Sequence, residues 1–561
     1  MEKHTKIFSL PVLSMVWFVI ALVVPNLIMC FSEDYGPLTW IGSVVLPFGL
    51  YTLFASFAKA PWKTWIWMLP FTFFAAFQIV LLNLYGGGPI AVDMFLNMAT
   101  TNTTEVYELL SGLLPALLEV AVLYIVPLLL AIVAAKNEKT LSLRVRSFMK
   151  WWGIALTLIG VAFMVAAMLG KERANPLRQL FPVNVCANLF TAFERWDQTK
   201  HYSETSAGFR YNATPTHPAD STEVYVLVVG ESSRAVNWQL AGYDRPTNPS
   251  LSKEDGLYFF PKTLSESNTT HKSVPLLLSP LNAHNFNDSV YRVKGIVEAF
   301  REAGFRTSYI SAQQPNGSYI DFFMNEADNH KFVNQGAKEH VGDFQLLPEL
   351  DKELARPERK KMIVLHCYGS HYNYQDRYPS SMAIFRPDGP LESDPKKREE
   401  LVNAYDNSIL MTDSLLSAVI SRLKEVDGLT AMIYTSDHGE NIYDDERQLF
   451  LHASPTTSYW QQHVPFLVWL SQRYSLCNPK ASEVLVRNIP RQISSSESFF
   501  PTAVDIAGIK MSGPERFSLL NPDYSAPAPV FLDDHNVAVP LREALAHPAD
   551  RRNLLMHGFS Y

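Results

Sequence analysis

The chain has 561 residues, of which 47% are hydrophobic and 18% charged, and its formal net charge at pH 7 is −7. This negative balance argues against a nucleic-acid-binding protein, because domains that bind nucleic acid are normally basic. The four cysteines show no CxxC spacing and one lies in an apolar run, so we expect neither a disulfide framework nor a cysteine-based zinc site.

Five long apolar segments fill the first 170 residues. Each is long enough to cross a bilayer, which takes about 20 residues of helix. Five such segments in succession are not what the core of a soluble protein requires, so the sequence predicts a bundle of five transmembrane helices over residues 1–170. The expected spans are 8–31, 38–58, 64–84, 113–135 and 152–170.

The charges of the loops predict the orientation of these helices. Lysine and arginine collect at the N-terminus and in the loops 58–63 and 136–150, whereas the loop 32–37 carries only acidic charges. Since positive residues favour the cytoplasmic side, five crossings place everything after the fifth span outside the cytoplasm. The stretch 171–220 lacks a sustained hydrophobic period, and we interpret it as a linker with room for a short interfacial helix.

The loop 86–112 lies outside in this topology and contains an amphipathic pattern. Asn97, Thr101 and Glu105 follow one another at intervals of four residues, so they share one face of a helix. A polar stripe at the membrane surface suits a lipid headgroup. A plain solvated helix face explains the same spacing equally well.

From residue 221 onward, short β-branched runs alternate with amphipathic stretches such as Val290–Ala303 and Glu399–Lys424. Strands this apolar are buried on both faces. The sequence therefore predicts an α/β domain over 221–561, in which helices cover a mostly parallel sheet. The candidate strands are Val224–Val229, Arg306–Ile310, Met362–Leu365, Ala431–Tyr434 and Val464–Leu470.

Candidate metal ligands follow two of these strands. Glu231 comes after the first strand, and the adjacent pair Asp437 and His438 comes after the fourth. Ligands in such folds bind beyond the carboxyl ends of the strands. Carboxylates and imidazoles on rigid loops bind zinc or a hard divalent cation, so these residues predict a metal site.

A hydroxyl-rich segment, Ser267–Pro275, opens an apolar helix and supplies candidate nucleophiles. Metal coordination lowers the pKa of a hydroxyl group and activates it for attack. The N–H groups at a helix N-terminus also bind phosphate. Thr269, Thr270 and Ser273 are all candidates, and the spacing alone does not rank them.

Seven motifs occur in order along the chain: VVGESSR at 228–234, GYDRPTNP at 242–249, TxxSVP at 270–275, GSH at 369–371, SDHGE at 436–440, LH at 451–452 and HVPFLVW at 463–469. With these motifs the chain resembles the phosphoethanolamine transferases of the alkaline phosphatase/sulfatase superfamily. Those enzymes of the bacterial inner membrane modify lipid A or the lipopolysaccharide core. The resemblance covers almost the whole chain and implies a sulfatase-like catalytic domain in the periplasm.

The resemblance also implies a set of site residues. The implied ligands of one tightly bound Zn²⁺, with a second ion allowed, are Glu231, Thr270, Asp437 and His438. The implied catalytic residues are Thr270, as nucleophile, with His371 and His452. The implied substrate-binding residues are Asn97, Thr101, Glu105, His371 and His452.

The implied reaction transfers phosphoethanolamine from phosphatidylethanolamine to a lipopolysaccharide acceptor through a phosphothreonine intermediate. The acceptor is a core sugar or lipid A. Two alternatives stay open: a phosphoglycerol transferase of the same superfamily, and a non-enzymatic membrane sensor with a degenerate hydrolase domain. Joint presence of Glu231, Thr270, Asp437 and His438 argues against the sensor.

The segment around Thr270 departs from the pattern of the family. The lipid A enzymes flank the nucleophile with paired cysteines, and the corresponding positions here are Glu266 and Leu276. This difference weakens lipid A as the acceptor but leaves the chemistry intact. His271 and Lys272 are also unusual, and we expect exposed side chains there or, for Lys272, attraction of an anionic acceptor.

Overall fold

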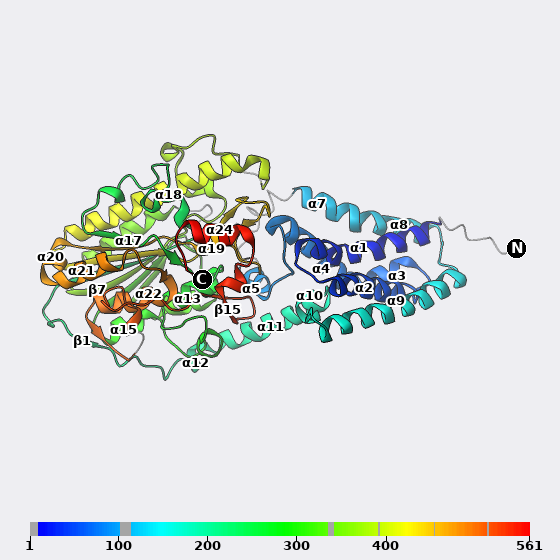
Figure 1. Cartoon of the computed structure of the whole chain (residues 1–561), viewed down its shortest axis with the longest axis horizontal. Helices are drawn as coiled ribbons and strands as arrows, with labels where there is room; N and C mark the ends of the chain where they lie inside the picture. The colour runs from blue at the N-terminus through cyan, green and yellow to red at the C-terminus, as the bar shows by residue number, and fades with distance from the viewer. Residues whose placement is uncertain are drawn as a thin grey trace. The chain divides into compact units, whose positions relative to one another are not determined.

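The computed structural model describes residues 9–100, 114–334, 342–390, 393–453, 455–512 and 515–560 (Figure 1). The chain divides into two compact units. The first consists of Met1–Phe95 and Leu110–Phe193, and the second of Leu96–Leu109 and Glu194–Tyr561.

The first unit is built from apolar helices. Among the described residues, four helices are long and apolar enough to cross a membrane, or five if the bent pair α3–α4 counts as one span. The helices are α1 (Leu10–Ser32), α2 (Pro37–Ala55), α3 (Pro61–Trp67), α4 (Leu69–Tyr85), α7 (Leu114–Val120), α8 (Val126–Lys136), α9 (Leu143–Leu169) and α10 (Pro176–Gln179). A π-helical turn, Ala121–Ile125, joins α7 to α8, while α5 (Val92–Thr100) and α11 (Val183–Lys200) run across the division.

Two of the expected spans differ from the structure. The third is not one straight helix, because α3 and α4 meet at an angle of 72°. Pro70, the second residue of α4, explains the break, since proline lacks an N–H group and its ring clashes with the carbonyl four residues earlier. The fifth helix begins at Leu143 rather than at 152, after an N-cap in which the Ser142 hydroxyl accepts from the Val145 amide.

Glycines allow α2 and α9 to pack closely. A Cβ atom added at Gly42 or Gly49 would meet the backbone of α9, and one added at Gly153 or Gly160 would meet the backbone of α2. Small residues at a helix interface let two backbones approach, which is how many transmembrane helices associate. The four glycines therefore form a seam between α2 and α9.

The second unit contains a seven-stranded sheet in the order β3-β11-β8-β2-β7-β5-β6. The strands are β2 (Glu223–Gly230), β3 (Leu257–Phe259), β5 (Arg306–Ser311), β6 (Asn329–Phe332), β7 (Lys360–His366), β8 (Leu429–Ser436) and β11 (Phe466–Leu470). Six of them point in one direction, and only β11, which pairs antiparallel with both β8 and β3, points in the other. The prediction of a mostly parallel sheet is confirmed.

All five expected strands are present, and the sequence missed only short ones in this sheet, β3 and β6. Both lie at sheet edges and are partly exposed, so they lack the continuous apolar runs of buried strands. Small two-stranded pairs complete the unit: β1 (Thr214–Pro215) with β13 (Ile509–Lys510), β4 (Thr263–Leu264) with β12 (Ile493–Ser494), β9 (Asn441–Ile442) with β10 (Phe450–Leu451), and β14 (Val530–Leu532) with β15 (Ala538–Pro540).

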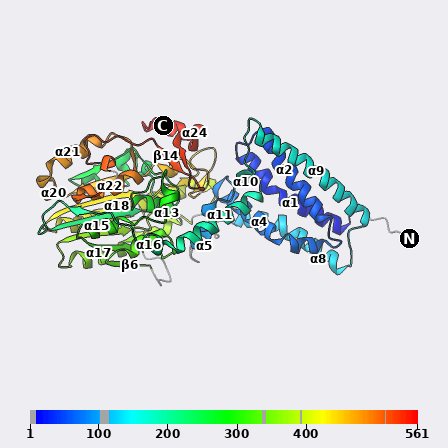
Figure 2. The same cartoon turned by 90° about the horizontal axis from the view of Figure 1, so that it is seen from below.

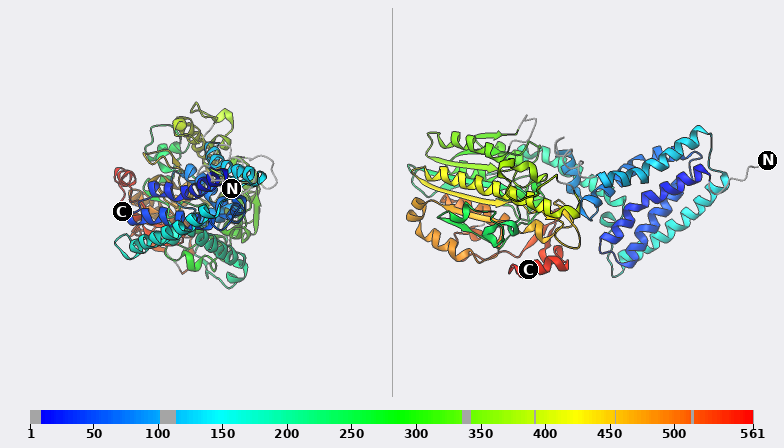
Figure 3. Two further views of the ribbon diagram at one scale, coloured as in Figure 1. Left: turned by 90° about the vertical axis from the view of Figure 1, so that its right-hand side faces the viewer. Right: turned by 90° about the horizontal axis from the view of Figure 1, so that it is seen from above.

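Helices cover both faces of the large sheet, which runs between them (Figure 2, Figure 3). One face carries α13 (Thr270–Leu277), α15 (Ile296–Glu302), α16 (Tyr319–Asn325) and α22 (Ser495–Ile506), and the other carries α17 (Leu346–Leu354) and α18 (Arg398–Lys424). The remaining helices are α12 (Tyr202–Thr205), α14 (Phe286–Ser289), α19 (Tyr459–Gln462), α20 (Gln472–Cys477), α21 (Pro479–Asn488), α23 (Leu541–Ala544) and α24 (Pro548–Met556).

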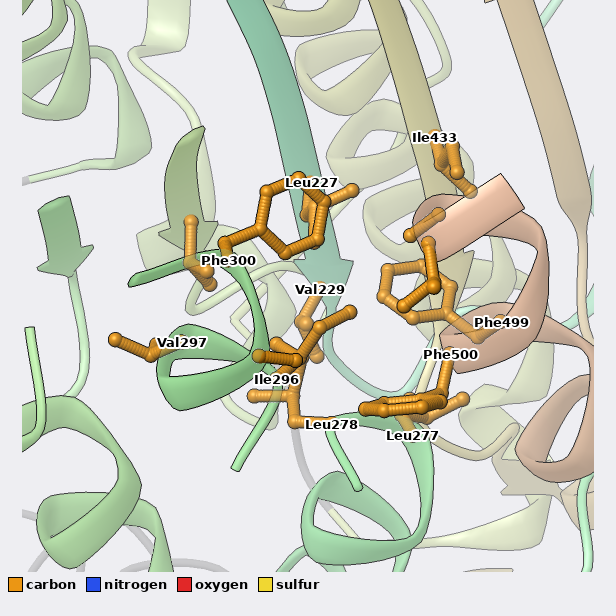
Figure 4. Close-up of a cluster of buried hydrophobic side chains, with 14 of the residues drawn as sticks. Leu227, Val229, Leu277, Leu278, Ile296, Val297, Phe300, Ile433, Phe499 and Phe500 are labelled. Atoms are coloured by element: carbon orange, nitrogen blue, oxygen red, sulfur yellow. The ribbon is translucent and has the colours of Figure 1, made fainter. Parts of the chain in front are cut away.

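An extensive hydrophobic core lies between the sheet and the layer formed by α13, α15 and α22. Leu227 and Val229 of β2 point into it, and Phe300 of α15 and Phe500 of α22 pack nearby (Figure 4). The alternate residues of β2 are buried on the opposite face. This double burial explains the uninterrupted apolar run in the sequence and holds rigid the strand ends that carry the site.

Phe300→Ala is expected to lower the free energy of unfolding by about 3–5 kcal/mol, because it leaves a cavity in this core. Thermal unfolding of the full-length chain in detergent measures the change as a lower melting temperature. The control is Leu476→Ala, whose side chain is 74% exposed and should change the melting temperature little. Equal shifts for the two variants would contradict the placement of Phe300 in the core.

Candidate active site

Strand register brings the predicted ligands together. Gly230 at the end of β2 pairs with Ser436 at the end of β8, so the next residues, Glu231 and Asp437, leave adjacent strands at the same level. On the other side of β2, β7 pairs in parallel and leads into the loop that carries His371. The carboxyl edge of the sheet therefore gathers residues that are up to 206 positions apart in the sequence, the separation of Glu231 and Asp437.

The imidazole of His438 lies at the centre of the cluster. Its Nδ1–H donates to the carbonyl of Gly439 at 2.9 Å, so Nε2 carries the lone pair. Nε2 lies 3.2 Å from Thr270 Oγ1, 3.4 Å from Glu231 Oε1 and 3.3 Å from Asp437 Oδ2. The four residues expected to be ligands thus present one donor atom each to a common point.

Geometry distinguishes the three hydroxyls that the sequence left equal. Thr270 is the first residue of α13, and its hydroxyl donates to Glu231 Oε2 at 3.2 Å. The hydroxyl of Ser273 instead donates to Asp437 Oδ2 at 3.0 Å, and Thr269 Oγ1 faces the hydroxyl of Ser267 at 3.3 Å. Of the three, Thr270 alone has its oxygen between a carboxylate and an imidazole of the cluster.

Two carboxylates are buried side by side in this cluster. Glu231 is 1% exposed and Asp437 is fully buried. Burial, followed by repulsion from Asp437, raises the pKa of Glu231 well above its ordinary value. In the described part of the chain, the ion-pairing contact recorded for either carboxylate is with His438 rather than with lysine or arginine.

Such a donor set fits a divalent metal. Buried carboxylates are normally paired with a cation or bound to a metal, and two carboxylates, an imidazole and a hydroxyl are suitable ligands for zinc or a similar ion. Glu231, His438 and His452 each offer a ligand atom, and these atoms lie within 4.8 Å of one another. His452, which the sequence placed among the catalytic residues, is therefore also within reach of a metal.

Two further histidines border the cluster with defined tautomers. His452 Nδ1 lies 3.2 Å from Glu440 Oε1, and its ring centre is 4.1 Å from that of His438. His371 Nδ1 donates to the carbonyl of Tyr372 at 2.7 Å. Burial lowers the pKa of His438 and of His452 to about 4 and that of His371 well below its ordinary value. Neutral imidazoles of this kind accept protons or bind metals through Nε2.

The cluster opens into a small hollow. Its volume is about 150 Å³, well below the roughly 300–1,000 Å³ of pockets that enclose a drug-sized ligand, so a small group fits rather than a whole lipid. The lining includes Asn97, whereas Thr101 and Glu105 lie outside the described residues. Other lining residues are Glu231, Thr269, Thr270, His271, Gln313, Gln314, Pro315, Asn316, Ile320, His371, His452 and Ala453.

Sequence reasoning missed two residues that contact the predicted site. Gln313 Nε2 donates to the Cys367 carbonyl at 2.9 Å and lies 3.5 Å from Glu231 Oε2. It follows β5, so the rule that ligands gather beyond strand ends was a signal for it. Glu440 lies within the SDHGE motif and faces His452, but a motif letter does not reveal which partner a side chain contacts.

The chain is similar in sequence to known families and proteins. A family model described as Sulfatase matches residues 223–509. Phosphoethanolamine transferase EptA of Salmonella typhimurium is 26% identical over 491 residues, 84% of this chain and 88% of the relative. Phosphoethanolamine transferase EptA of Escherichia coli K12 is 29% identical over 293 residues, 51% of this chain and 53% of the relative. In that second match the chain spans about half of the relative's length.

Solved structures share the fold at low sequence identity. The integral membrane protein lipooligosaccharide phosphoethanolamine transferase A from Neisseria meningitidis is 19% identical, with a TM-score of 0.66 over 91% of this chain and 99% of that one. The C-terminal periplasmic domain of EcEptC from Escherichia coli, in complex with Zn, is 23% identical, with a TM-score of 0.54 over 61% of this chain and 98% of that one. Apolar helices followed by an α/β domain of this type form one known architecture.

Metal removal is expected to destabilise the second unit, because Glu231 and Asp437 then repel each other across the cluster. A chelator should lower the melting temperature of the purified chain by roughly 5 °C or more. Glu231→Gln should lose bound metal, measured by elemental analysis, and with it the response to the chelator. Glu446→Gln, an exposed carboxyl, is the control; full metal content in Glu231→Gln would rule out the assigned ligand set.

Glu266, a buried carboxyl four residues before Thr270, predicts a pH dependence of stability. Burial, with repulsion from Glu497 second, raises the pKa of Glu266 from 4.5 to about 8. The folded chain keeps a proton that the unfolded chain releases near pH 4.5, so this group's stabilising contribution is lost as pH rises toward 8. Glu266→Gln should therefore show a shallower fall of melting temperature between pH 6.5 and 8 than the parent. Parallel curves would contradict the buried, protonated state.

Proposed function

The chain belongs to the sulfatase family, and we propose that it is a metal-dependent phosphoethanolamine transferase. It takes phosphoethanolamine from phosphatidylethanolamine and passes it to a lipopolysaccharide acceptor, either a core sugar or lipid A. The names of the matched relatives support the transferred group, and one of them, of Salmonella typhimurium, is named a Kdo(2)-lipid A phosphoethanolamine 7''-transferase; it is 30% identical over 48% of each chain. We place the enzyme in a bacterial inner membrane with its second unit in the periplasm.

One observation carries the proposal: Thr270 Oγ1 lies 3.2 Å from both Glu231 Oε2 and His438 Nε2. A hydroxyl held between a carboxylate and an imidazole, at the entrance to a hollow, has the surroundings of an activated nucleophile. Thr270 is also the first residue of α13, at the end of the helix whose positive dipole favours phosphoryl oxygens.

Glu231, Thr270, Asp437 and His438 would hold a Zn²⁺ ion, and the ligand atom of His452 lies within 4.8 Å of those of Glu231 and His438. When bound, zinc supplies Lewis-acid chemistry that lowers the pKa of the Thr270 hydroxyl and neutralises charge on the phosphoryl oxygens. The zinc complex of the EcEptC domain, whose fold is shared, supports this choice of metal.

The reaction consists of two displacements. In the first, Thr270 Oγ1 attacks phosphorus, the bond to the diacylglycerol oxygen breaks, and diacylglycerol leaves as the alcohol with the proton that Thr270 gave up. In the second, an acceptor hydroxyl oxygen attacks phosphorus, the bond between phosphorus and Thr270 Oγ1 breaks, and Thr270 regains the proton that the acceptor hydroxyl gives up. Nε2 of His371 or His452 relays the proton in each step, since the Nδ1 atoms of both rings face other groups.

Intact-mass measurement tests the first displacement. Incubation with phosphatidylethanolamine should add one phosphoethanolamine group to the metal-loaded chain, and Thr270→Ala should add none. Transfer to lipopolysaccharide should fall by at least about 10³-fold in that variant, because the attacking atom is gone. Ser421→Ala removes an exposed hydroxyl of α18 and serves as the control.

The same measurement separates the alternatives. An adduct with the mass of glycerol phosphate, formed from phosphatidylglycerol in preference, would replace the proposed donor. An adduct that survives Thr270→Ala would remove Thr270 from its role. A chain that holds no stoichiometric metal and forms no adduct would favour a membrane sensor. Mass spectrometry of lipopolysaccharide from cells with and without the protein then identifies the acceptor.

A further inference from the structure

Lys272 is buried beside the proposed nucleophile, contrary to the expectation of an exposed side chain. It lies two residues after Thr270 in the first turn of α13 and is 2% exposed. Its Nζ donates to the backbone carbonyl of Asp533 at 2.7 Å. The ammonium group is thus committed to a contact within the fold, which leaves it poorly placed to attract an anionic acceptor from solution.

The partner of Lys272 belongs to the hairpin of β14 and β15. The residue before Asp533, Leu532, donates its backbone N–H to the carbonyl of Glu266 at 2.7 Å. Glu266 precedes Thr270 in the chain and Lys272 follows it. We call residues 266–273 the nucleophile segment. Two consecutive residues of one hairpin therefore contact this segment on both sides of Thr270.

The hairpin turn is itself well fixed. Asp533 Oδ1 accepts from the N–H groups of His535 at 2.9 Å and Val537 at 2.8 Å, which closes the turn. Arg195 of α11 donates to the carbonyl of Asp534 at 2.8 Å. Two adjacent backbone carbonyls of the turn, those of Asp533 and Asp534, thus accept hydrogen bonds from cationic side chains, one from α13 and one from α11.

The position of Lys272 is energetically unfavourable without such a contact. A cation in the first turn of a helix opposes the helix dipole, whose N-terminal end is positive. Burial of an ammonium group also costs free energy unless it is hydrogen-bonded. A methionine in the same place would avoid both costs. What the lysine adds is therefore its hydrogen bond to the hairpin, which holds the first turn of α13 in position.

We propose that the β14–β15 hairpin is a clamp on the nucleophile segment, and that Lys272 is a positioning residue which sets Thr270 Oγ1 between Glu231 and His438. The expected effect on the rate of phosphoethanolamine transfer rests on the proposed function. The clamp itself concerns only how firmly residues 269–273 are held. A shift of about 1 Å in a reacting atom costs on the order of 10²-fold in rate, so loosening the first turn of α13 acts on the chemical step rather than on lipid binding.

The test compares Lys272→Met with a matched control, Lys361→Met, in the metal-loaded full-length chain. Lys361 is also a buried lysine that donates to backbone carbonyls, those of Leu354 and Arg356, but it stands at the opposite end of β7 from the site. Lys272→Arg retains a cationic donor and should restore most of the lost rate. Amide hydrogen exchange of residues 269–273, metal content and the rate of phosphoethanolamine adduct formation are measured for each.

Lys272→Met is expected to raise amide exchange in 269–273 by roughly tenfold or more and to slow adduct formation at saturating lipid by roughly 10- to 100-fold, with unchanged metal content and unchanged half-saturating lipid concentration. Lys361→Met should change neither quantity. Unchanged exchange in Lys272→Met, or equal effects of the two methionine variants, would overturn the clamp.

Two further outcomes are distinguishable. If the parent chain forms no adduct from phosphatidylethanolamine, the proposed function fails, and the exchange data still decide the clamp. If Lys272→Met does not fold, Arg195→Met loosens the hairpin from the side of α11 and should raise exchange in 269–273 by a smaller factor. No rise in that folded variant would overturn the proposal.

Discussion

The arrangement of the site depends on one constraint: two buried carboxylates lie side by side, and they cannot both stay charged without a cation. Glu231 and Asp437 leave neighbouring strands at the same level and are both withdrawn from water. Like charges in such surroundings repel strongly, because the medium screens them poorly. A cation between them turns the repulsion into attraction. The imidazole of His438 and the hydroxyl of Thr270 lie around the same point as additional donors.

The same hydrogen bonds hold both the segment that carries Thr270 and the predicted metal ligand Asp437. The hydroxyl of Ser265 donates to the backbone carbonyl of Asp437 at 2.6 Å, and that of Ser273 donates to the Asp437 carboxylate at 3.0 Å. These serines stand on either side of Thr270. The segment that carries Thr270 is therefore tied to one of the predicted ligands, Asp437, at two points.

The sequence predicted the parts of this molecule that depend on local pattern. Apolar runs located every central strand, and the position of Glu231 and Asp437 after two of them anticipated where they would meet, since parallel strands end at one edge. The choice of Thr270 over Ser273 came from the resemblance, because spacing within one helical turn does not show which hydroxyl is the nucleophile. Contacts such as Lys272 with Asp533 join residues 261 positions apart, and no periodicity encodes them. The bend at Pro70 was not readable from a proline alone, since Pro25 and Pro47 also stand inside expected spans and lie within the unbroken helices α1 and α2.

That bend bears on the side of a membrane at which the chain emerges after the helical region. Alone, α4 has 17 residues and is about 25 Å long, somewhat less than the roughly 30 Å of a bilayer's hydrocarbon core. Each crossing reverses the side on which the chain emerges, so only an odd number of crossings delivers the two ends of the helical region to opposite compartments. Among the described helices that number is odd when α3 and α4 act as a single crossing. Among the described helices, the parity of the crossings is therefore set by how the bent pair α3–α4 is counted.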